Sequence, residues 1–388
     1  MESNKTAHNP SFSSAIVLLR RKIRRETKDQ NVVLPHKQSR SKLLTKIEKL
    51  ILTVVEDISF SKEPKLQVPR RSTWVDCNIV NRKLSLKDKS QLKYQEILYT
   101  KNTKRMTVIF NLLAKVHNLL QNRTSVTYRE LYYQHTDLYE SQNTVKTAIL
   151  DICHLLNTSP WDLRVFSTSK GLIAGPLLIK LGDNETIINC LSKGGVLVPQ
   201  NVKKIVKLES SAKFVIVVEK DAAFQKLLEE EVLSRLGPCL LLTGKGEPDI
   251  NTRLLLHRLW QDLKIPIFAL VDSDPYGIEI MCTYRFGSLS MLEYSEHLAI
   301  PAIRWLGIHP TDIDALSIPS VPLTTNDNIK LLDLAGRPYI QNDANLMKQI
   351  NCMITSGKKC EIENLSILST NFLTDVFLCA KIISKEVI

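Results

Sequence analysis

Three continuous apolar runs constrain the fold of this chain more than any other feature of its sequence. The runs are Lys213–Glu219, Cys239–Thr243 and Pro266–Asp272. An apolar run without polar alternation is typical of a parallel strand that is buried on both faces. Helical patterns follow the three runs in turn, at about Ala222–Leu236, Asp249–Leu263 and Tyr276–Arg285. Strands that alternate with helices predict a parallel α/β sheet with right-handed crossovers.

The part of the chain before these runs has a mostly helical pattern. Apolar residues recur at helical spacing in three stretches, Ser41–Ile58, Thr103–Asn122 and Thr144–Leu156. Thr127 and Glu130 have the spacing of a capping box, which predicts that a short helix begins at Thr127. Residues 61–73 contain two prolines and show no periodicity, so we interpret them as a linker.

Two short strands are expected on either side of Lys170-Gly171. Their patterns cover Arg164–Ser167 and Leu172–Leu181. Three helices followed by a two-stranded wing are the pattern of a winged helix, an α+β domain. The sequence therefore predicts two domains, a winged helix and a Rossmann-like parallel α/β domain.

A chain of 388 residues is long enough for two or three domains. We expect a basic, disordered tail at residues 1–40 and a helical segment with a linker at 41–100. The winged-helix domain is expected at 101–182, and the α/β domain with a helical C-terminal elaboration at 183–388.

The formal net charge of +12 suggests a polyanionic partner, either nucleic acid or a membrane. The first 50 residues hold 12 Lys or Arg and 4 Asp or Glu, so most of the net charge lies there. The cluster Arg20-Arg21-Lys22-Ile23-Arg24-Arg25 fits a nuclear localisation signal, although such clusters are common. There is no run of about 18 apolar residues, so no membrane-spanning helix is expected.

The eight cysteines show no CxxC spacing and mostly fall in apolar runs. They are Cys77, Cys153, Cys190, Cys239, Cys282, Cys352, Cys360 and Cys379. We interpret them as reduced core thiols of an intracellular protein, rather than as a zinc site or a disulfide framework.

Three acidic residues follow two of the predicted parallel strands. Glu219 ends the first strand, Asp272 ends the third, and Asp274 comes two residues later. Ligands bind beyond the carboxyl ends of parallel strands, and oxygen ligands of this kind suit Mg²⁺. The alternative is that these acids cap helices, and Asp274 before Pro275 fits that role. Three acids on two strand ends favour the metal site.

Gly244-Lys245-Gly246 follows the second strand, which we place between the two strands that carry the acids. Its glycines would let the backbone approach a phosphate, and Lys245 would supply positive charge. The segment lacks the full P-loop pattern, so a nucleotide site is not expected. An ordinary flexible turn explains the segment equally well.

Tyr133 is the candidate nucleophile of the short helix that begins at Thr127. On a helix, Tyr132 shares an apolar face with Tyr128 and Leu131, whereas Tyr133 points about 100° away. Arg129, four residues before Tyr133, is its neighbour on the polar face. A guanidinium there favours the phenolate and can hold a phosphate oxygen. The alternative, an exposed Tyr stacked on an Arg, is common.

The sequence resembles the A subunit of type IIB DNA topoisomerase (topoisomerase VI) and, more closely, its eukaryotic relative, the meiotic double-strand-break transesterase. The matching motifs span roughly residues 100–345 in the family's order. They are Arg129-Glu130-Leu131-Tyr132-Tyr133, Ser167-Thr168-Ser169-Lys170-Gly171-Leu172, Val218-Glu219-Lys220-Asp221-Ala222, Thr243-Gly244-Lys245-Gly246, Pro248-Asp249-Ile250-Asn251-Thr252-Arg253, Val271-Asp272-Ser273-Asp274-Pro275-Tyr276-Gly277 and Arg337-Pro338-Tyr339-Ile340.

The resemblance implies a winged-helix domain with the nucleophile and a Toprim domain with the metal. The family's nucleophilic tyrosine falls on Tyr133 and its motif arginine on Arg129. The Toprim glutamate falls on Glu219, and the Asp-x-Asp motif falls on Asp272 and Asp274. Lys170 and Lys245 are the candidate DNA contacts. Glu247 departs from the family pattern, which usually has an aromatic or apolar residue there.

The resemblance also implies partners. Double-stranded DNA is the substrate, Mg²⁺ the cofactor and the nucleus the expected location. Family members act as a homodimer with shared active sites and pair with a B-type, ATPase-like partner, and this chain has no ATP-binding motif of its own. The expected reaction is a meiotic double-strand break through a 5′-phosphotyrosyl link.

Three other functions use some of the same features. A Toprim-type nuclease or primase needs the acids but not Tyr133. A non-catalytic DNA-binding scaffold needs neither, so the intact candidate residues count against it. A metabolic α/β enzyme would need a cofactor fingerprint, which the sequence lacks, and does not explain the basic N-terminal segment.

Overall fold

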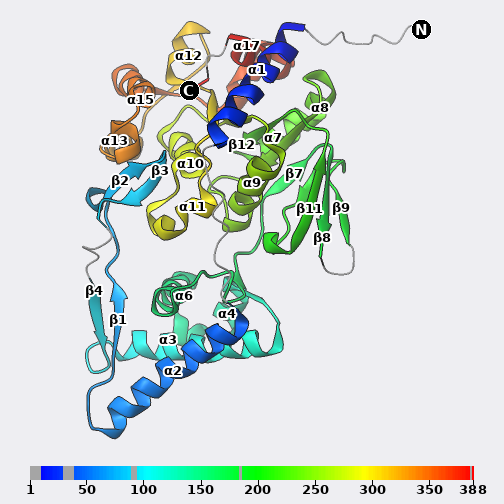
Figure 1. The fold of residues 1–388 in the computed structure, drawn as a ribbon. Helices are drawn as coiled ribbons and strands as arrows, with labels where there is room; N and C mark the ends of the chain where they lie inside the picture. Colours follow the sequence, from blue (N-terminus) through cyan, green and yellow to red (C-terminus); the bar gives the residue numbers. More distant parts are fainter. Residues whose placement is uncertain (1–9, 29–38, 89–93, 183–185, 385–386) are drawn as a thin grey trace. The chain divides into compact units, whose positions relative to one another are not determined.

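The computed structural model describes residues 10–28, 39–88, 94–182, 186–384 and 387–388, and only the backbone at 10, 11 and 23–28. The chain divides into two compact units, each described by itself (Figure 1). The helical unit comprises residues 33–76 and 87–168. The sheet unit comprises residues 1–32, 77–86 and 169–388.

The helical unit is built from helices that pack through their apolar faces. Its elements are α2 (Arg40–Ser59), β1 (Lys65–Pro69), η1 (Trp74–Asp76), β4 (Tyr94–Leu98), α3 (Thr103–Asn122), β5 (Val126–Thr127), α4 (Tyr128–Gln134), α5 (Thr136–Tyr139), α6 (Gln142–Leu156) and β6 (Val165–Phe166). Fully buried side chains such as Ile47, Leu112 and Ile149 form one core between α2, α3 and α6. Helices α2, α3 and α6 confirm the three helical stretches that apolar spacing predicts in this part of the chain.

The predicted linker at residues 61–73 is wrong in part. β1 occupies its middle and pairs antiparallel with β4, so that Leu66 lies opposite Ile97. Both of these side chains are buried in the core of the helical unit. The alternation of polar residues with buried Leu66 and Val68 is a strand signal, but it is only five residues long, and its pairing strand follows about 30 residues later.

A six-stranded sheet lies at the centre of the sheet unit, in the order β10-β7-β13-β12-β14-β15. The strands are β7 (Leu172–Ala174), β10 (Val196–Leu197), β12 (Phe214–Val218), β13 (Cys239–Thr243), β14 (Ile267–Leu270) and β15 (Arg304–Gly307). β13, β12, β14 and β15 are parallel, β7 is antiparallel to β13, and β10 is antiparallel to β7. Every residue of β12, β13 and β14 is buried, as the continuous apolar runs predict.

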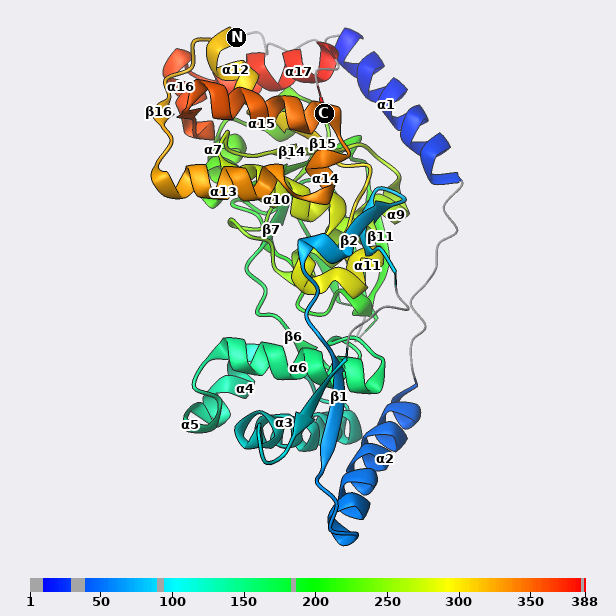
Figure 2. The same ribbon diagram turned by 90° about the vertical axis from the view of Figure 1, so that its left-hand side faces the viewer.

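Helices cover this sheet, and the chain after β15 is mostly helical. They are α7 (Asp221–Glu229), α8 (Val232–Arg235), α9 (Ile250–Leu263), α10 (Pro275–Phe286), α11 (Ser295–Leu298), α12 (Pro310–Ala315), α13 (Thr325–Ala335), α14 (Pro338–Gln341), α15 (Ala344–Ser356), α16 (Leu365–Leu368) and α17 (Leu378–Ser384). Figure 2 shows α13 and α15 side by side. Short helical turns lie at η3 (Val202–Lys204), η4 (Leu289–Tyr294), η5 (Ile362–Asn364) and η6 (Phe372–Phe377).

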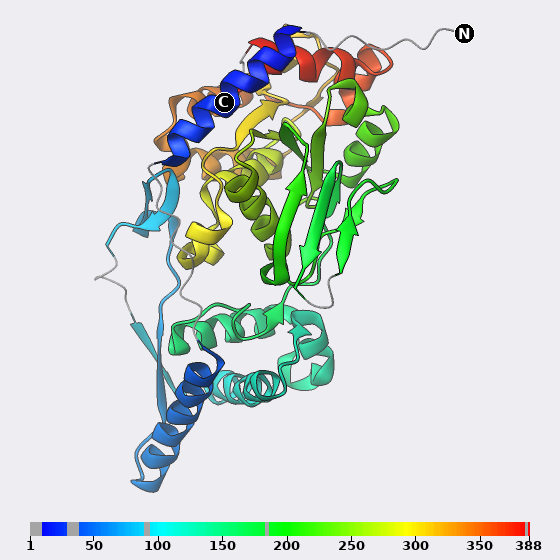
Figure 3. The same ribbon diagram turned by 45° about the vertical axis from the view of Figure 1, so that its right-hand side comes forward.

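The predicted wing is wrong, and so is the domain boundary at residue 182. β7 pairs with β13 in the central sheet, and Gly175 then turns the chain into β8 (Leu177–Leu181). β8 lies between β9 (Ile187–Asn189) and β11 (Ile205–Ser210) in a three-stranded sheet, drawn in green in Figure 3. β6 instead pairs in parallel with β5. The sheet unit therefore resumes at Ser169.

Two further pairs of short antiparallel strands complete the sheet unit. β2 (Cys77–Val80) pairs with β3 (Lys83–Leu86), and β16 (Val321–Pro322) pairs with β17 (Lys358–Lys359). The β2–β3 hairpin interrupts the helical unit in sequence but belongs to the sheet unit. All eight cysteines are free, and six of them are buried, in agreement with core thiols.

The prediction of a disordered tail is wrong for Pro10–Lys28, which forms helix α1. Phe12, Ile16 and Leu19 of α1 are buried in the core of the sheet unit, and α1 packs against α17. Burial of this apolar face stabilises a helix that charge counting alone assigns to a solvated tail. Residues 1–9 and 29–38, and the side chains of Ile23, Arg24 and Arg25, lie outside the described part.

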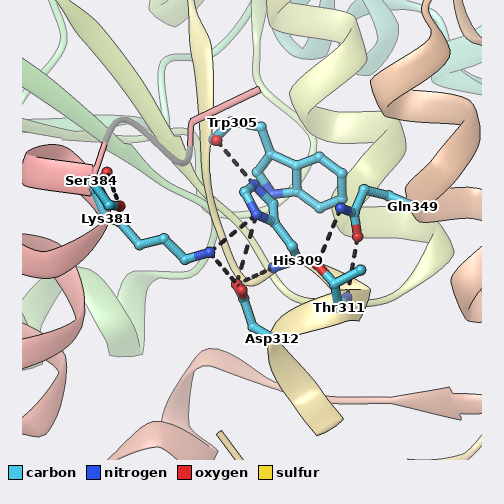
Figure 4. Close-up of polar contacts among 7 residues, drawn as sticks. All are labelled: Trp305, His309, Thr311, Asp312, Gln349, Lys381 and Ser384. Carbon is cyan, nitrogen blue, oxygen red and sulfur yellow. Dashed lines mark hydrogen bonds and ion pairs between the residues drawn. The ribbon is translucent and has the colours of Figure 1, made fainter. Parts of the chain in front are cut away.

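A buried polar cluster attaches α17 to the rest of the sheet unit (Figure 4). Lys381 Nζ lies 2.5 Å from Asp312 Oδ1 and 3.3 Å from His309 Nδ1. His309 Nε2 lies 3.1 Å from the carbonyl oxygen of Trp305, at the end of β15. Because burial lowers the pKa of His309 to about 4, its imidazole is neutral at pH 7 and Lys381 and Asp312 form the charged pair.

Among the described helices, none is by itself long and apolar enough to cross a membrane. The pair Ile362–Leu368 and Phe372–Ser384 meets the length and composition criterion only when the two are combined across a bend of 97°. Leu365, Leu373 and Leu378 of this pair are buried in the core of the sheet unit.

Candidate active site

The acidic residues predicted to bind a metal lie at the carboxyl ends of two neighbouring strands. β12 pairs directly with β14, with Val218 opposite Leu270, so Glu219 and Asp272 leave the sheet side by side. The sequence placed the Gly244-Lys245-Gly246 strand between them, and that order is wrong. β12 is the middle strand, and β13 lies on its other side.

Glu219 and Asp272 are joined by a hydrogen bond. The backbone N–H of Asp272 donates to Glu219 Oε2 at 2.9 Å, and the two residues are only 7% and 2% exposed. Gly277, in the first turn of α10, lies close to both. A Cβ atom at Gly277 would lie 2.5 Å from the Asp272 carbonyl oxygen and 2.9 Å from Glu219 Oε2. The absence of a side chain at residue 277 lets α10 begin beside the acids.

Asp274 caps helix α10. Its Oδ1 accepts a hydrogen bond of 2.7 Å from the backbone N–H of Gly277, and Pro275 occupies the first helical position. The alternative raised by the sequence, that Asp274 is an N-cap, is therefore confirmed. One of its carboxylate oxygens is committed to the helix.

Both oxygens of Asp272 are also engaged. Oδ1 accepts a hydrogen bond of 2.9 Å from the backbone N–H of Ile362, and Oδ2 lies 2.7 Å from Lys220 Nζ. Lys220 follows Glu219 directly, at the N-cap position of α7. Lys220 therefore forms an ion pair with Asp272, which the sequence predicts to be a metal ligand.

Burial is the main cause of the pKa shifts at this site. It raises the pKa of Glu219, and the negative charge of Asp272 raises it further. Burial also raises the pKa of Asp272, although Lys220 partly offsets this effect. Asp274 has a raised pKa for the same primary reason. Carboxyl groups crowded together in this way favour protonation until a cation neutralises them.

The donor set fits a hard divalent cation in chemistry, because it consists of oxygens with mutually repelling charges. The arrangement of these side chains does not form a full set of metal ligands. In the part of the chain that the structure describes, no group of three His, Cys, Asp or Glu side chains is arranged to hold a metal ion. In addition, Lys220 and the first turn of α10 contact oxygens of Asp272 and Asp274 that a metal would use.

The loop after β13 is held by local contacts rather than left open for a ligand. The backbone N–H of Gly246 donates to the Glu219 carbonyl at 2.8 Å, and that of Lys245 donates to Thr243 Oγ1 at 3.0 Å. Lys245 Nζ pairs with Asp221 at 2.9 Å, and Lys170 Nζ donates to the Lys245 carbonyl at 3.1 Å. Both lysines are thus engaged within the sheet unit, and Glu247 beside them is exposed.

Tyr133 lies on α4 of the helical unit with the geometry that the helix-face argument predicts. Its side chain is 60% exposed, and the guanidinium of Arg129 lies 5.7 Å from its ring centroid. Tyr132 is half-buried and packs against the core of the helical unit. The capping box is present, because Thr127 accepts from the Glu130 N–H and Glu130 accepts from the Thr127 N–H. The Tyr133 phenol is therefore exposed, and the capping box defines where its helix begins.

Comparison with known proteins relates both units to one family. A family model described as the Toprim domain of Spo11 and of the topoisomerase 6 A subunit matches residues 214–382. A second, described as type IIB DNA topoisomerase, matches residues 104–165. The chain is 39% identical over 349 residues to the meiotic recombination protein SPO11 of Mus musculus, which covers 89% of this chain and 88% of that protein.

The chain belongs to the family of Spo11 and the topoisomerase 6 A subunit. It is 32% identical over 348 residues to the A subunit of DNA topoisomerase 6 of Arabidopsis thaliana, covering 88% of this chain and 80% of that protein. It is 34% identical over 343 residues to the meiotic recombination protein W68 of Drosophila melanogaster, covering 87% and 96%. The resemblance seen in the sequence is confirmed, as is the Toprim assignment.

Two parts of the site were not predicted from the sequence. Lys220 stands within a family motif, but the sequence alone indicated no role for it. Glu361, Ile362 and Glu363 lie in the segment that the sequence predicts only as a helical C-terminal elaboration. The structure brings this stretch to Asp272 through the Ile362 hydrogen bond and a bridge between Ser273 and Cys360. No pattern along the chain indicated that approach.

Proposed function

We propose that this member of the Spo11 family is a topoisomerase-like DNA transesterase that makes meiotic DNA double-strand breaks. The observation that carries the proposal is the exposed Tyr133 phenol beside Arg129, on the capped helix α4 of a chain with a Toprim match. The relatives named as meiotic recombination proteins support the meiotic role, and such a role places the protein on chromosomes in the nucleus.

In the proposed reaction, the Tyr133 phenolic oxygen forms a bond to a backbone phosphorus, and the bond from phosphorus to the 3′ oxygen breaks. The phenolic proton is lost, and the leaving oxygen gains a proton to become a 3′-hydroxyl. One phosphodiester replaces another, so the step needs no ATP. Arg129 is close enough to the phenol to hold a phosphate oxygen and to stabilise the developing charge.

Glu219, Asp272 and Asp274 would hold the magnesium ion of the proposed enzyme. A bound Mg²⁺ supplies positive charge to phosphate oxygens in such reactions. The raised pKa values of Glu219 and Asp272 support the assignment, because burial, their main cause, penalises the charged carboxylates and a bound cation would offset that penalty. The chain's own contribution is to hold Glu219 and Asp272 together through the hydrogen bond between them.

The proposal extends to DNA binding and to partners. The helical unit, in which α4 carries the exposed Tyr133, is proposed to act as a winged-helix-type DNA-binding domain, although the strands predicted to form its wing do not pair with each other. Lys170 and Lys245 are proposed DNA contacts, and each would have to leave its present partner. The proposed assembly is a homodimer with shared sites, joined by a B-type, ATPase-like partner. The relatives named as topoisomerase 6 A subunits support the B-type partner.

The experiment that tests the proposal traps covalent protein–DNA adducts. The full chain, a B-type partner, Mg²⁺ and supercoiled DNA are mixed and then denatured, and protein attached to 5′ ends is measured. We expect the wild type to form adducts and Tyr133→Phe to form none, because phenylalanine keeps the ring but lacks the attacking oxygen. Tyr132→Phe is the matched control and should retain adduct formation.

The outcomes separate the competing functions. A Tyr133→Phe protein that still forms adducts contradicts the assignment of the nucleophile. Breaks without attached protein, unchanged by Tyr133→Phe, indicate a Toprim-type nuclease. DNA binding without breaks, in the presence of the partner, indicates a non-catalytic scaffold.

A further inference from the structure

Lys220 is in direct contact with one of the proposed metal-binding acids. Its ammonium lies 2.7 Å from Asp272 Oδ2, in a pair where Asp272 has a side-chain exposure of 2% and Lys220 of 33%. The same ammonium lies 3.1 Å from Glu361 Oε2 and 3.9 Å from Glu363 Oε2. Lys220 is therefore positioned between one buried acid and two more exposed ones.

The three carboxylates around Lys220 differ in how well they are satisfied. Asp272 has a partner for each oxygen, because Ile362 donates to Oδ1 and Lys220 pairs with Oδ2. Glu363 Oε2 is buried and has no hydrogen-bond partner within the described chain. Glu361 has a side-chain exposure of 65%. A buried, unsatisfied carboxylate oxygen is a strong acceptor for a donor that can reach it.

Short backbone connections fix this arrangement. Lys220 follows Glu219 in the chain, and Ile362, between the two glutamates, is hydrogen-bonded to Asp272. The bridge between Ser273 and Cys360 holds the same segment. Only the flexible lysine side chain needs to rotate for its ammonium to leave Asp272 for Glu363.

We infer that Lys220 is a built-in counter-ion of the metal site. Its ammonium holds Asp272 Oδ2 while no divalent cation is bound; when one binds, it leaves Asp272, keeps its contact with Glu361 and approaches Glu363. This inference rests on the proposed metal site. It makes Lys220 a positioning residue and explains why the acids are assembled although no three of them are arranged as a ligand set in the described residues. It gives Glu361 and Glu363 a role as acceptors for the displaced ammonium.

The inference has a consequence for affinity. A cation that must first displace Lys220 from Asp272 binds more weakly than one that meets a free carboxylate, because the ion pair has to be broken. Removal of the lysine charge should therefore strengthen binding of a divalent cation. A residue that merely helps to build the site would have the opposite effect.

The test measures binding of Mn²⁺ to the full chain without DNA, by the loss of the free Mn²⁺ signal in electron paramagnetic resonance. We expect Lys220→Met to bind Mn²⁺ roughly tenfold more tightly than wild type at low salt. Lys220→Arg keeps the charge and should not tighten binding. Lys226→Met is the matched control, because Lys226 has a similar side-chain exposure of 35% but contacts Glu230 and Ser366 instead of the acids.

A double-mutant cycle tests the role of the two glutamates. Glu361→Gln with Glu363→Gln should weaken Mn²⁺ binding several-fold in the wild-type background, because the displaced lysine loses its acceptors. The same pair of changes should have little effect in Lys220→Met, because no lysine remains to be accepted. An equal effect in both backgrounds means that the glutamates attract the cation directly, which overturns their proposed role.

Thermal unfolding with and without Mn²⁺ shows that each variant is folded. If Lys220→Met does not fold, Lys220→Gln replaces it, because glutamine is neutral and can still donate to Asp272. Unchanged or weaker Mn²⁺ binding by a folded neutral variant overturns the inference. Glu219→Gln separates this failure from that of the metal site itself. If the wild type binds no Mn²⁺, or if Glu219→Gln binds Mn²⁺ as tightly as the wild type, both the metal site and the inference about Lys220 are overturned.

Discussion

Gly277 leaves no room for a side chain beside the proposed metal-binding acids. In the interior of an ordinary helix, Gly→Ala stabilises by about 1 kcal/mol. Here the added Cβ would meet the Asp272 carbonyl oxygen at 2.5 Å and Glu219 Oε2 at 2.9 Å. Glu219 Oε2 accepts the hydrogen bond from the Asp272 N–H, so a shift of this oxygen away from the added Cβ would weaken that bond.

We therefore predict that Gly277→Ala lowers the free energy of unfolding by about 1–3 kcal/mol and weakens divalent-cation binding. Chemical denaturation and Mn²⁺ titration measure the two effects. Gly336→Ala is the control, because its Cβ would meet nothing closer than 3.6 Å. Equal stability of the two variants would show that the first turn of α10 can shift away from the acids.

At the scale of elements, α4 illustrates how a local signal positions a reactive group. Thr127 caps the helix that carries Tyr133, and loss of a threonine cap costs about 1 kcal/mol. Thr127→Ala should lower the stability of the helical unit by about that amount and also slow adduct formation, because the first turn of α4 frays. Thermal unfolding and the adduct assay measure the two effects.

Ser141→Ala is the matched control for this prediction. Ser141 caps α6 through a hydrogen bond of 3.1 Å from the Thr144 N–H, and α6 does not carry the candidate nucleophile. Its loss should destabilise by a similar amount and leave the rate of adduct formation unchanged. An equal loss of rate in both variants would attribute the effect to general instability.

The attachment of α17 provides a prediction for pH dependence. Burial lowers the pKa of His309 to about 4, from its ordinary value of 6.5. Between these values the unfolded chain binds a proton that the folded chain does not. The stability that neutral His309 contributes is therefore complete above pH 6.5 and is lost as the pH falls toward 4.

We expect urea unfolding of the wild type to give a lower free energy of unfolding at pH 5 than at pH 7. His309→Gln should make this difference smaller by about 1–2 kcal/mol. Glutamine can still donate to the Trp305 carbonyl, which His309 contacts at 3.1 Å. His117→Gln is the control, because the His117 side chain is partly exposed and pairs with the exposed Glu48. An identical pH slope in wild type and His309→Gln contradicts the prediction.

At the scale of the whole molecule, the N-terminal helix is part of the folded body. Ile16 of α1 is 2% exposed within the core of the sheet unit, whereas Val17 beside it is 49% exposed. Ile16→Ala should lower the free energy of unfolding by about 2–4 kcal/mol, and Val17→Ala by less than about 0.5 kcal/mol. Thermal or chemical unfolding measures both. Equal, small effects would mean that α1 detaches before the sheet unit unfolds.

Some features of the protein follow from the sequence by itself. The buried strands, the long helices, the capping box at Thr127 and the outward direction of Tyr133 depend on residues that are close in the chain. Periodicity and capping act within a few residues, and for that reason the pattern could predict them. The family resemblance, too, lies in short local motifs.

Only the tertiary structure decided which distant segments pair. It placed β12 between β13 and β14, moved β7 and β8 out of the predicted wing, and packed α1 against α17. It also brought Ile362 to Asp272, 90 residues away in the chain, and Lys220 to the same carboxylate. Such contacts depend on complementary surfaces and unsatisfied polar groups in separate segments, which no local pattern in this single sequence encodes.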